Sequence, residues 1–216
     1  MGEETLSAYA EAHTTPETQV LHRLNRETHL TKVYPRMLAG LLQGTFLRFI
    51  STMIRPARIL EIGTFTGYSA INLAAGLAEG GLIHTIEADP EQEEIIRRYF
   101  QEAGMTNRVR LHIGKAIEVI PTLEENWDLV YLDADKPSYL IYYQMIIGRI
   151  RPGGFLLADN VLWNGKVLEP KEKMDRDTRG IDDFNKAVQA DEQVENVLLP
   201  FRDGIMMVRK KAGQTL

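Results

Sequence analysis

Cysteine is absent from all 216 residues of the sequence. Its absence excludes disulfide bonds, thiolate catalysis and sulfur-ligated metals, so any metal must bind oxygen or imidazole ligands. The sequence also has little excess charge, because 25 basic and 30 acidic residues give a net charge of -5. So small a charge provides no global attraction for a polyanion such as nucleic acid.

A targeting segment and long apolar runs are also missing from the sequence. The N-terminal residues have no charged start followed by an apolar stretch, and no apolar run approaches the roughly 18 residues of a membrane span. We therefore predict a cytoplasmic protein without a membrane partner. Hydrophobic side chains make up 44% of the sequence, enough for one core, so we expect a single domain over residues 1–216.

From residue 58 onward, short apolar runs alternate with amphipathic stretches. The runs are RILEI, LIHTIE, VRLHI, DLVYLD and GFLLAD. This alternation is typical of right-handed crossovers and a parallel sheet with helices on both faces. Two further strand-like runs, at 194–199 and 205–209, are separated by PFRDG, which suits an antiparallel hairpin. By analogy with class I methyltransferases, we predict an α/β fold: a Rossmann-like, doubly wound, mostly parallel seven-stranded sheet with a C-terminal antiparallel hairpin.

Residues 1–55 are predicted to form a helical segment that packs on the sheet. Pro16 can start a helix with an apolar face at Val20, Leu21 and Leu24. A second apolar helix is indicated by Leu42, Phe46, Leu47, Phe49 and Ile50. By contrast, the polar and charged stretch at 169–180 is predicted to be a surface loop.

The segment RILEIGTFTGYSA indicates a strand, a glycine-containing turn and a helix. Gly63 and Gly67 let the backbone approach a ligand at the helix start, where free N–H groups and the helix dipole favour a carboxylate. Their spacing differs from the G-x-G-x-x-G of dinucleotide sites. Glu87 ends the second strand, where an acid can accept hydrogen bonds from both ribose hydroxyls. We therefore predict a cofactor with an adenosine and a carboxylate. The alternative is a plain tight turn and a solvated Glu87.

Two further predicted strands end in oxygen ligands. Asp133 and Asp135 follow one strand, and Asp159 and Asn160 end the other. Because ligands gather at the carboxyl ends of parallel strands, these side chains should converge beside the cofactor. Such an all-oxygen set favours magnesium, with calcium or manganese as alternatives, over zinc. The other interpretation is that the aspartates cap helices or simply end strands.

Lys136 is the candidate catalytic residue. It lies three residues after Asp133, where it could take the proton of an acceptor hydroxyl. If Asp135 pairs with Lys136 instead, the lysine stays charged and positions the substrate.

Five segments together resemble the metal-dependent O-methyltransferase family that includes the caffeoyl-CoA and catechol O-methyltransferases. They are EIGTFTGYSA, IEADPE, DADKPSY, ADNVLWNGKV and LPFRDGIMMVRK, within residues 35–211. The resemblance implies S-adenosylmethionine (SAM) as cofactor and a magnesium-type site, with Lys136 as the base and with metal ligands Asp133, Asp159 and Asn160. It also implies a cofactor site of Glu61, Gly63, Thr64, Gly67 and Ser69 at the methionine end, Glu87 at the ribose, Ala116 at the adenine, and Asp133.

The favoured hypothesis is therefore SAM-dependent and metal-dependent O-methylation of a small hydroxylated aromatic acceptor, on one hydroxyl of a catechol-like vicinal diol. The resemblance further implies a homodimer. Trp163 could form a wall of the acceptor site, against the acceptor ring, or serve only as a packing anchor.

One alternative acceptor is a hydroxylated base in transfer RNA, with phosphate contacts from Arg36, Lys166, Lys171, Lys173, Arg176 and Arg179. Another alternative is a non-catalytic nucleotide-binding protein.

Overall fold

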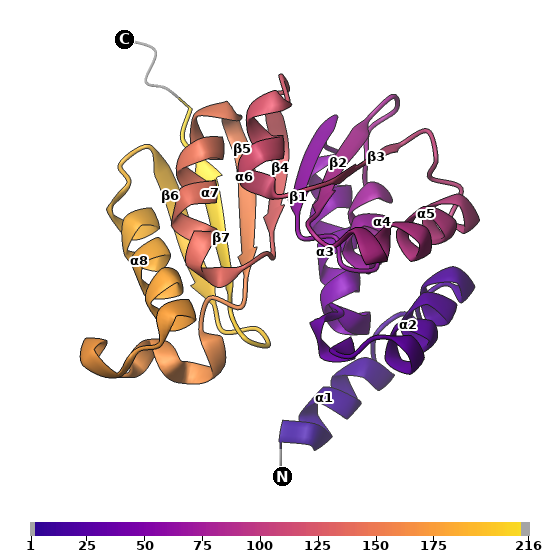
Figure 1. Ribbon diagram of the computed structural model, residues 1–216, viewed down its shortest axis with the longest axis horizontal. Coiled ribbons are helices and arrows are strands. Elements are labelled where there is room, and N and C mark those ends of the chain that lie inside the picture. Colours follow the sequence, from indigo (N-terminus) through magenta and orange to yellow (C-terminus); the bar gives the residue numbers. More distant parts are fainter. Residues whose placement is uncertain (1–2, 213–216) are drawn as a thin grey trace.

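Seven strands form one sheet in the computed structural model, which describes residues 3–212 (Figure 1). Their order is β3-β2-β1-β4-β5-β7-β6. Strands β1 to β5 are parallel, whereas β7 pairs antiparallel with both β5 and β6. The strands are β1 Arg58–Ile62, β2 Leu82–Glu87, β3 Val109–Ile113, β4 Trp127–Leu132, β5 Ile150–Asp159, β6 Val194–Leu199 and β7 Ile205–Lys210. The predicted mostly parallel sheet with a terminal hairpin is confirmed.

Helices cover both faces of the sheet. Alternate strand residues point to opposite sides, and apolar residues on both sides pack against helices. In β1, Leu60 and Ile62 belong to one buried cluster with α6, α7 and α8, whereas Ile59 belongs to a second cluster with α2 to α5. The helices are α1 Glu3–Ala12, α2 Gln19–Thr31, α3 Gly40–Ile54, α4 Tyr68–Ala74, α5 Glu93–Glu102, α6 Ala116–Val119, α7 Tyr139–Ile146 and α8 Arg176–Ala190. The fold is thus the doubly wound arrangement that the alternating sequence predicts.

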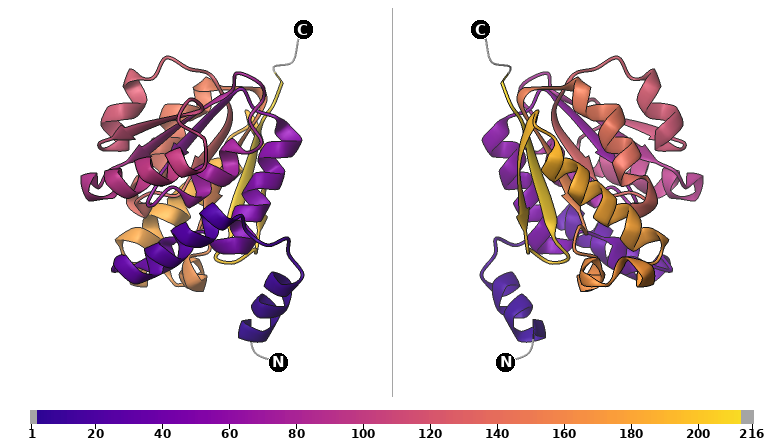
Figure 2. Two further views of the ribbon diagram at one scale, coloured as in Figure 1. Left: turned by 90° about the vertical axis from the view of Figure 1, so that its right-hand side faces the viewer. Right: turned by 90° about the vertical axis from the view of Figure 1, so that its left-hand side faces the viewer.

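Residues 3–54 contain three α-helices and a short 3-10 helix, Pro35–Met37, in agreement with the predicted helical segment. Helix α2 begins later than predicted, because the Thr18 side chain, and not Pro16, supplies its N-terminal cap. Of the five residues that indicated the second apolar helix, Leu47 is fully buried in α3, whereas Phe49 is 55% exposed. Helix α1 extends away from the sheet (Figure 2).

The predicted single domain over residues 1–216 includes residues 1–2 and 213–216, which lie outside the described part of the chain.

The loop predicted at 169–180 is wrong in its second half. Asp175 accepts a hydrogen bond from the backbone N–H of Thr178 and caps α8, which begins at residue 176. Beyond the cap, Ile181, Phe184 and Val188 are fully buried on one face of the helix. Their spacing of three and four residues is the ordinary signal of an amphipathic helix, and the charged residues around it concealed the pattern.

One stretch, Pro35–Ile54, has the length and the mean hydropathy, 1.4, of a membrane-crossing segment, with 33% of its most apolar window buried. The prediction that no apolar run approaches such a length is therefore wrong, because this stretch reaches it in length and hydropathy. The stretch is not one continuous α-helix, because Leu38 is extended and the α-helix itself has 15 residues. A 15-residue helix is about 22 Å long, short of the roughly 30 Å hydrocarbon core. Two of its polar side chains, Gln43 and Ser51, are hydrogen-bonded inside the fold.

The carboxyl ends of β1 and β4 approach each other so closely that only glycine fits between them. Gly63 has φ +99°, and a Cβ placed there would lie 1.9 Å from the carbonyl oxygen of Asp133. Gly67, with φ +94°, faces the Phe100 ring, which a Cβ would approach to 2.8 Å. Both glycines thus meet a packing requirement of the protein itself, in addition to the role predicted for them near a ligand.

Replacing Gly63 with alanine should destabilise the fold by roughly 3 kcal/mol or more, because the added methyl would overlap backbone and the left-handed conformation would be strained. Chemical denaturation measures the change. Gly80→Ala is the matched control: Gly80 also has positive φ, +69°, but no atom lies within 4 Å of the added Cβ. That control should lose only about 1 to 2 kcal/mol. Equal losses in the two variants would contradict the packing argument.

Candidate active site

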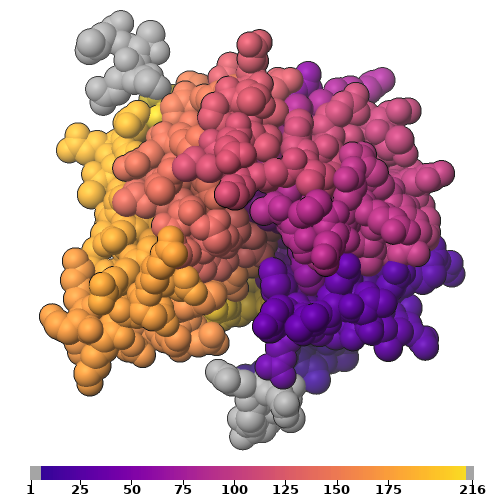
Figure 3. Space-filling model, in the orientation of Figure 1, coloured from indigo at the N-terminus to yellow at the C-terminus, as the bar shows by residue number. Residues whose placement is uncertain are grey.

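A cavity of about 830 Å³ opens at the carboxyl ends of β1, β2, β4 and β5, where parallel sheets bind ligands. Figure 3 shows the surface hollowed between the two halves of the molecule. The volume suffices for a nucleoside together with a small acceptor. The predicted site residues that line it are Gly63, Thr64, Ser69, Glu87, Ala116, Asp133, Lys136, Asp159 and Asn160. Glu61 and Gly67 are not in the lining.

Glu87, at the end of β2, is fixed by two backbone groups. Its Oε2 accepts the N–H of Phe65 at 2.6 Å, and its Oε1 accepts the N–H of Asp89 at 2.9 Å. The side chain is buried, and burial raises its pKa above the ordinary value. The carboxylate therefore lies in one orientation with unused lone pairs beside the cavity, an arrangement suited to vicinal hydroxyls. The alternative of a solvated Glu87 is wrong.

Glu61 lies beneath the cavity wall and is fully buried. Its Oε2 accepts the hydroxyl of Thr85 at 2.5 Å, and Thr85 in turn contacts the Thr64 hydroxyl at 2.5 Å. Burial raises the pKa of Glu61 from 4.5 to about 8. At neutral pH the residue is therefore mainly a neutral acid that supports the cavity-lining Thr64 from behind.

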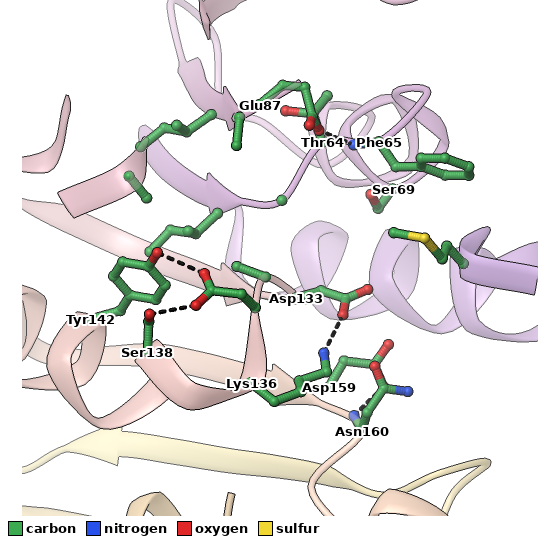
Figure 4. Close-up of a pocket in the computed structure, with 18 of the residues that line it drawn as sticks. Thr64, Phe65, Ser69, Glu87, Asp133, Lys136, Ser138, Tyr142, Asp159 and Asn160 are labelled. Atoms are coloured by element: carbon green, nitrogen blue, oxygen red, sulfur yellow. Dashed lines mark hydrogen bonds and ion pairs between the residues drawn. The ribbon is translucent and has the colours of Figure 1, made fainter. Parts of the chain in front are cut away.

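Lys136 is held between two partners on the floor of the cavity. Its Nζ donates to Asp133 Oδ1 at 2.8 Å (Figure 4) and to the Tyr139 hydroxyl at 2.6 Å. Asp135 does not pair with it. Instead, Asp135 accepts hydrogen bonds from the hydroxyls of Tyr142, at 2.8 Å, and Ser138. Of the three N–H groups of an ammonium, two are used, which leaves one for an acceptor oxygen.

Tyr139 anchors this arrangement from within the core. Its ring is fully buried, and burial raises its pKa well above the ordinary value, so the hydroxyl stays neutral. The hydroxyl accepts from Lys136 and can donate to the backbone carbonyl of Asp159 at 3.0 Å. One side chain thereby joins the ends of β4 and β5.

Asp159 is almost completely buried at the end of β5, with 4% of its surface exposed. Its Oδ1 accepts the backbone N–H of Asn160 at 2.8 Å. Asn160 has φ +58°, a left-handed conformation that asparagine tolerates better than most residues, and its side chain lies beside Asp159 (Figure 4). Burial, together with the negative charge of Asp133, raises the pKa of Asp159. The two aspartates are therefore close enough to repel each other.

The donor set at this end of the cavity fits a hard cation. Asp133 accepts one hydrogen bond, from Lys136, and the Asn160 carboxamide adds a neutral oxygen. Within residues 3–212, no three acidic, histidine or cysteine side chains converge, so two carboxylates and one carboxamide are the candidate ligands. Carboxylate and amide oxygens suit magnesium, calcium or manganese. A cation here would also relieve the repulsion between the aspartates.

Trp163 faces both the cavity and the core, and its role as a wall for an acceptor ring stays a prediction. Its side chain lines the cavity, with the ring centroid 5.8 Å from Lys136 Nζ, and it also packs against a core cluster.

Several other residues of the site were not predicted, namely Gln43, Tyr131, Tyr139, Tyr142 and Arg202. For Tyr139, the three-residue spacing from Lys136 at the start of a helix was a usable signal. Gln43 and Arg202 come from distant segments, and no local pattern marks them.

The family model described as O-methyltransferase matches residues 10–211 of this chain. A catechol O-methyltransferase from Niastella koreensis is 35% identical over 161 residues, covering 73% of this chain and 72% of the relative. Caffeoyl-CoA O-methyltransferase 5 from Nicotiana tabacum is 33% identical over 179 residues, covering 78% of this chain and 75% of that protein.

Solved structures are similar over nearly the whole chain. An O-methyltransferase from Bacillus cereus, in complex with SAH, has a TM-score of 0.89 at 28% identity and covers 96% of this chain and 97% of its own. The O-methyltransferase TomG from Streptomyces achromogenes, in complex with SAM, has a TM-score of 0.89 at 28% identity, with coverage of 98% and 100%. The similarity therefore includes the strand ends that form the cavity.

The buried Glu61 should make stability depend on pH. With a folded pKa of about 8 and an unfolded value of 4.5, its contribution is fully present below pH 4.5 and is lost as the pH rises through about 8. In between, the free energy of unfolding should fall by roughly 1.4 kcal/mol per pH unit from this group alone. Glu61→Gln should remove this component in denaturation curves from pH 5 to 8, and Glu91→Gln, at an exposed position, should retain it. Parallel curves for Glu61→Gln and the unchanged protein would contradict the assignment.

Proposed function

The chain belongs to the O-methyltransferase family, and on that premise we propose that it methylates one hydroxyl of a vicinal diol on a small aromatic molecule, with a divalent cation bound beside the acceptor. The methyl donor is SAM, and the enzyme is a SAM-dependent O-methyltransferase. One observation carries the proposal: the buried Lys136 and the carboxylates of Asp133 and Asp159 converge on the cavity that Glu87 also lines. A purely nucleotide-binding protein would not need a buried lysine in that place.

The chain provides separate surfaces for the two ends of SAM. Glu87, oriented by two backbone N–H groups, would accept the ribose hydroxyls, and Ala116 at the start of α6 borders the space for the adenine. Thr64 and Ser69 line the part of the cavity assigned to the methionine end. Because Glu61 lies behind this wall, we assign it the support of Thr64 and not direct contact with the cofactor.

Asp133, Asp159 and Asn160 would hold the cation, with magnesium expected and calcium or manganese as alternatives. When bound, the cation supplies positive charge that favours the ionised form of an acceptor hydroxyl. The rigid setting of Asp159, buried at the end of β5, would keep its carboxylate beside that of Asp133 without further rearrangement.

Lys136 would handle the acceptor proton. In the transfer itself, the acceptor oxygen loses its proton, a carbon–oxygen bond forms as the carbon–sulfur bond of SAM breaks, and the products are a methyl ether, S-adenosylhomocysteine and a proton. The Nζ group donates to Asp133 and Tyr139, so its remaining N–H can first orient the acceptor oxygen. To act as the base, Lys136 would first release one of its own protons to solvent, and the neutral amine would then take the proton of the acceptor hydroxyl. Alignment in the cavity supplies most of the remaining rate enhancement.

Methyl transfer from labelled SAM should require both a diol and a cation. We expect labelling of catechol-type diols with Mg²⁺, loss of labelling with a chelator, and little labelling of the matched phenol with a single hydroxyl. Bulk transfer RNA, tested in parallel, should stay unlabelled, since Lys166 is already paired with Asp175 at 2.9 Å and the net charge is negative. Labelling of RNA alone would replace the acceptor, and chelator-resistant labelling of diols would reject the cation.

Replacing Lys136 with methionine should lower kcat by about 10² to 10⁴-fold, the usual contribution of a proton-transfer group. SAM affinity should stay close to that of the unchanged enzyme, because Lys136 lies at the acceptor end. Steady-state kinetics and calorimetric titration of SAM measure the two quantities. Lys186→Met is the control, since Lys186 is exposed on α8 and pairs only with Asp182. A kcat within about threefold of the unchanged enzyme would reject the role of Lys136.

A homodimer also stays a prediction. Large apolar side chains are exposed on α1, at Leu6 and Tyr9, and on α3, at Phe49 and Met53, and these surfaces would suit a second copy. A monomer mass in solution would contradict the dimer.

A further inference from the structure

Gln43 is a buried polar side chain from α3, an element that contributes no strand end to the site. Only 1% of its surface is exposed. Its Nε2 donates to Asp159 Oδ2 at 2.5 Å and to the Tyr131 hydroxyl at 2.8 Å, and its Oε1 accepts from Arg202 Nη1 at 2.5 Å. Because arginine can only donate, the amide oxygen must face Arg202, and the amide nitrogen must therefore face Asp159.

These contacts determine which oxygen of Asp159 is constrained. Oδ2 receives the Gln43 amide and lies 3.1 Å from the Tyr131 hydroxyl, whereas Oδ1 receives the backbone N–H of Asn160. The carboxylate is thus held at both oxygens by groups from three elements. A carboxylate fixed in this way does not lose side-chain freedom when it binds a cation.

Arg202 extends the arrangement to the rim of the cavity. It lies in the turn between β6 and β7 with φ +52° and also donates to the backbone carbonyl of Ala39. Arg202, Ala39 and Gln43 all line the cavity. A continuous chain of hydrogen bonds therefore runs from the hairpin turn, through the start of α3, to Asp159.

Packing alone does not explain a glutamine at this position. Leu47, one turn further along α3, is fully buried and apolar, as expected for a helix face packed on the sheet. A buried amide costs free energy unless its polar atoms are hydrogen-bonded. All the partners that Gln43 has belong to the site or to its rim, so the side chain serves the site and not the helix.

We propose that Gln43 is a positioning residue for Asp159: its carboxamide sets the orientation of the carboxylate for a divalent cation and links that orientation to Arg202 at the rim. The proposal rests on the cation site of the proposed function and adds to it a residue outside the ligand set. Groups that orient metal ligands typically change metal affinity by about 10 to 100-fold when they are removed.

The test is Mn²⁺ binding to the full-length protein, followed by electron paramagnetic resonance. Gln43→Met, of similar length but without hydrogen-bonding groups, should raise the Kd for Mn²⁺ about 10 to 100-fold. SAM affinity should change little, and excess Mn²⁺ should restore methyl transfer. Because Arg202 is exposed, the Arg202→Met variant should fold. It should weaken Mn²⁺ binding by a smaller factor than Gln43→Met. Thr52→Val is the control, because its hydroxyl bonds only to Arg48 within α3.

Each outcome separates this proposal from the proposed function. If the unchanged protein binds no Mn²⁺, the cation site and the role of Gln43 both fail. If the unchanged protein binds Mn²⁺ and folded Gln43→Met binds it equally well, only the role of Gln43 fails. Should Gln43→Met not fold, an unaltered Mn²⁺ affinity in Arg202→Met would overturn the link to the rim.

Discussion

The close approach of the carboxyl ends of β1 and β4 is the constraint on which the site depends. Gly63 leaves no room for a side chain against the Asp133 carbonyl, so the turn after β1 and the acidic end of β4 lie next to each other. The turn after β1 lines the cavity on the side assigned to the cofactor in the proposed function, and the end of β4 carries Asp133 and leads to Lys136. A donor and an acceptor bound on the two sides of this contact are neighbours by construction, so the backbone itself supplies the proximity that methyl transfer requires.

Negative charge is the second organising feature of the cavity. Asp133, Asp159 and Glu87 all border it, and the buried Lys136 pairs with Asp133. Neutral donors stabilise the carboxylates through hydrogen bonds. Gln43 and Tyr131 donate to Asp159, and two backbone N–H groups donate to Glu87. Fixed neutral donors stabilise carboxylates without cancelling their charge, as the proposed cation site requires.

The sequence was sufficient for the fold because its evidence was local and repeated. Each strand-to-helix unit carried its own apolar run, and strand ends are where parallel sheets bring ligands together. The residues at those ends, such as Glu87 and Asp159, were therefore found. Gln43 and Arg202 were missed because they meet Asp159 only after the chain folds, across 116 residues in the case of Gln43. Lys136 was found, but the choice of Asp133 over Asp135 as its partner depends on Tyr142 and Ser138, which hold Asp135 elsewhere.

The position of β7 between β5 and β6 has a consequence for how the chain folds. β5 pairs on one side with β4, which precedes it, and on the other with β7, which follows only after α8 and β6. Until β7 arrives, β5 has an open edge of unpaired backbone groups, and an apolar strand in that state is prone to pair with other chains. Contacts between segments so far apart form slowly. Pairing with β7 therefore removes an aggregation-prone edge from β5, and the same step brings Arg202, in the turn before β7, to Gln43.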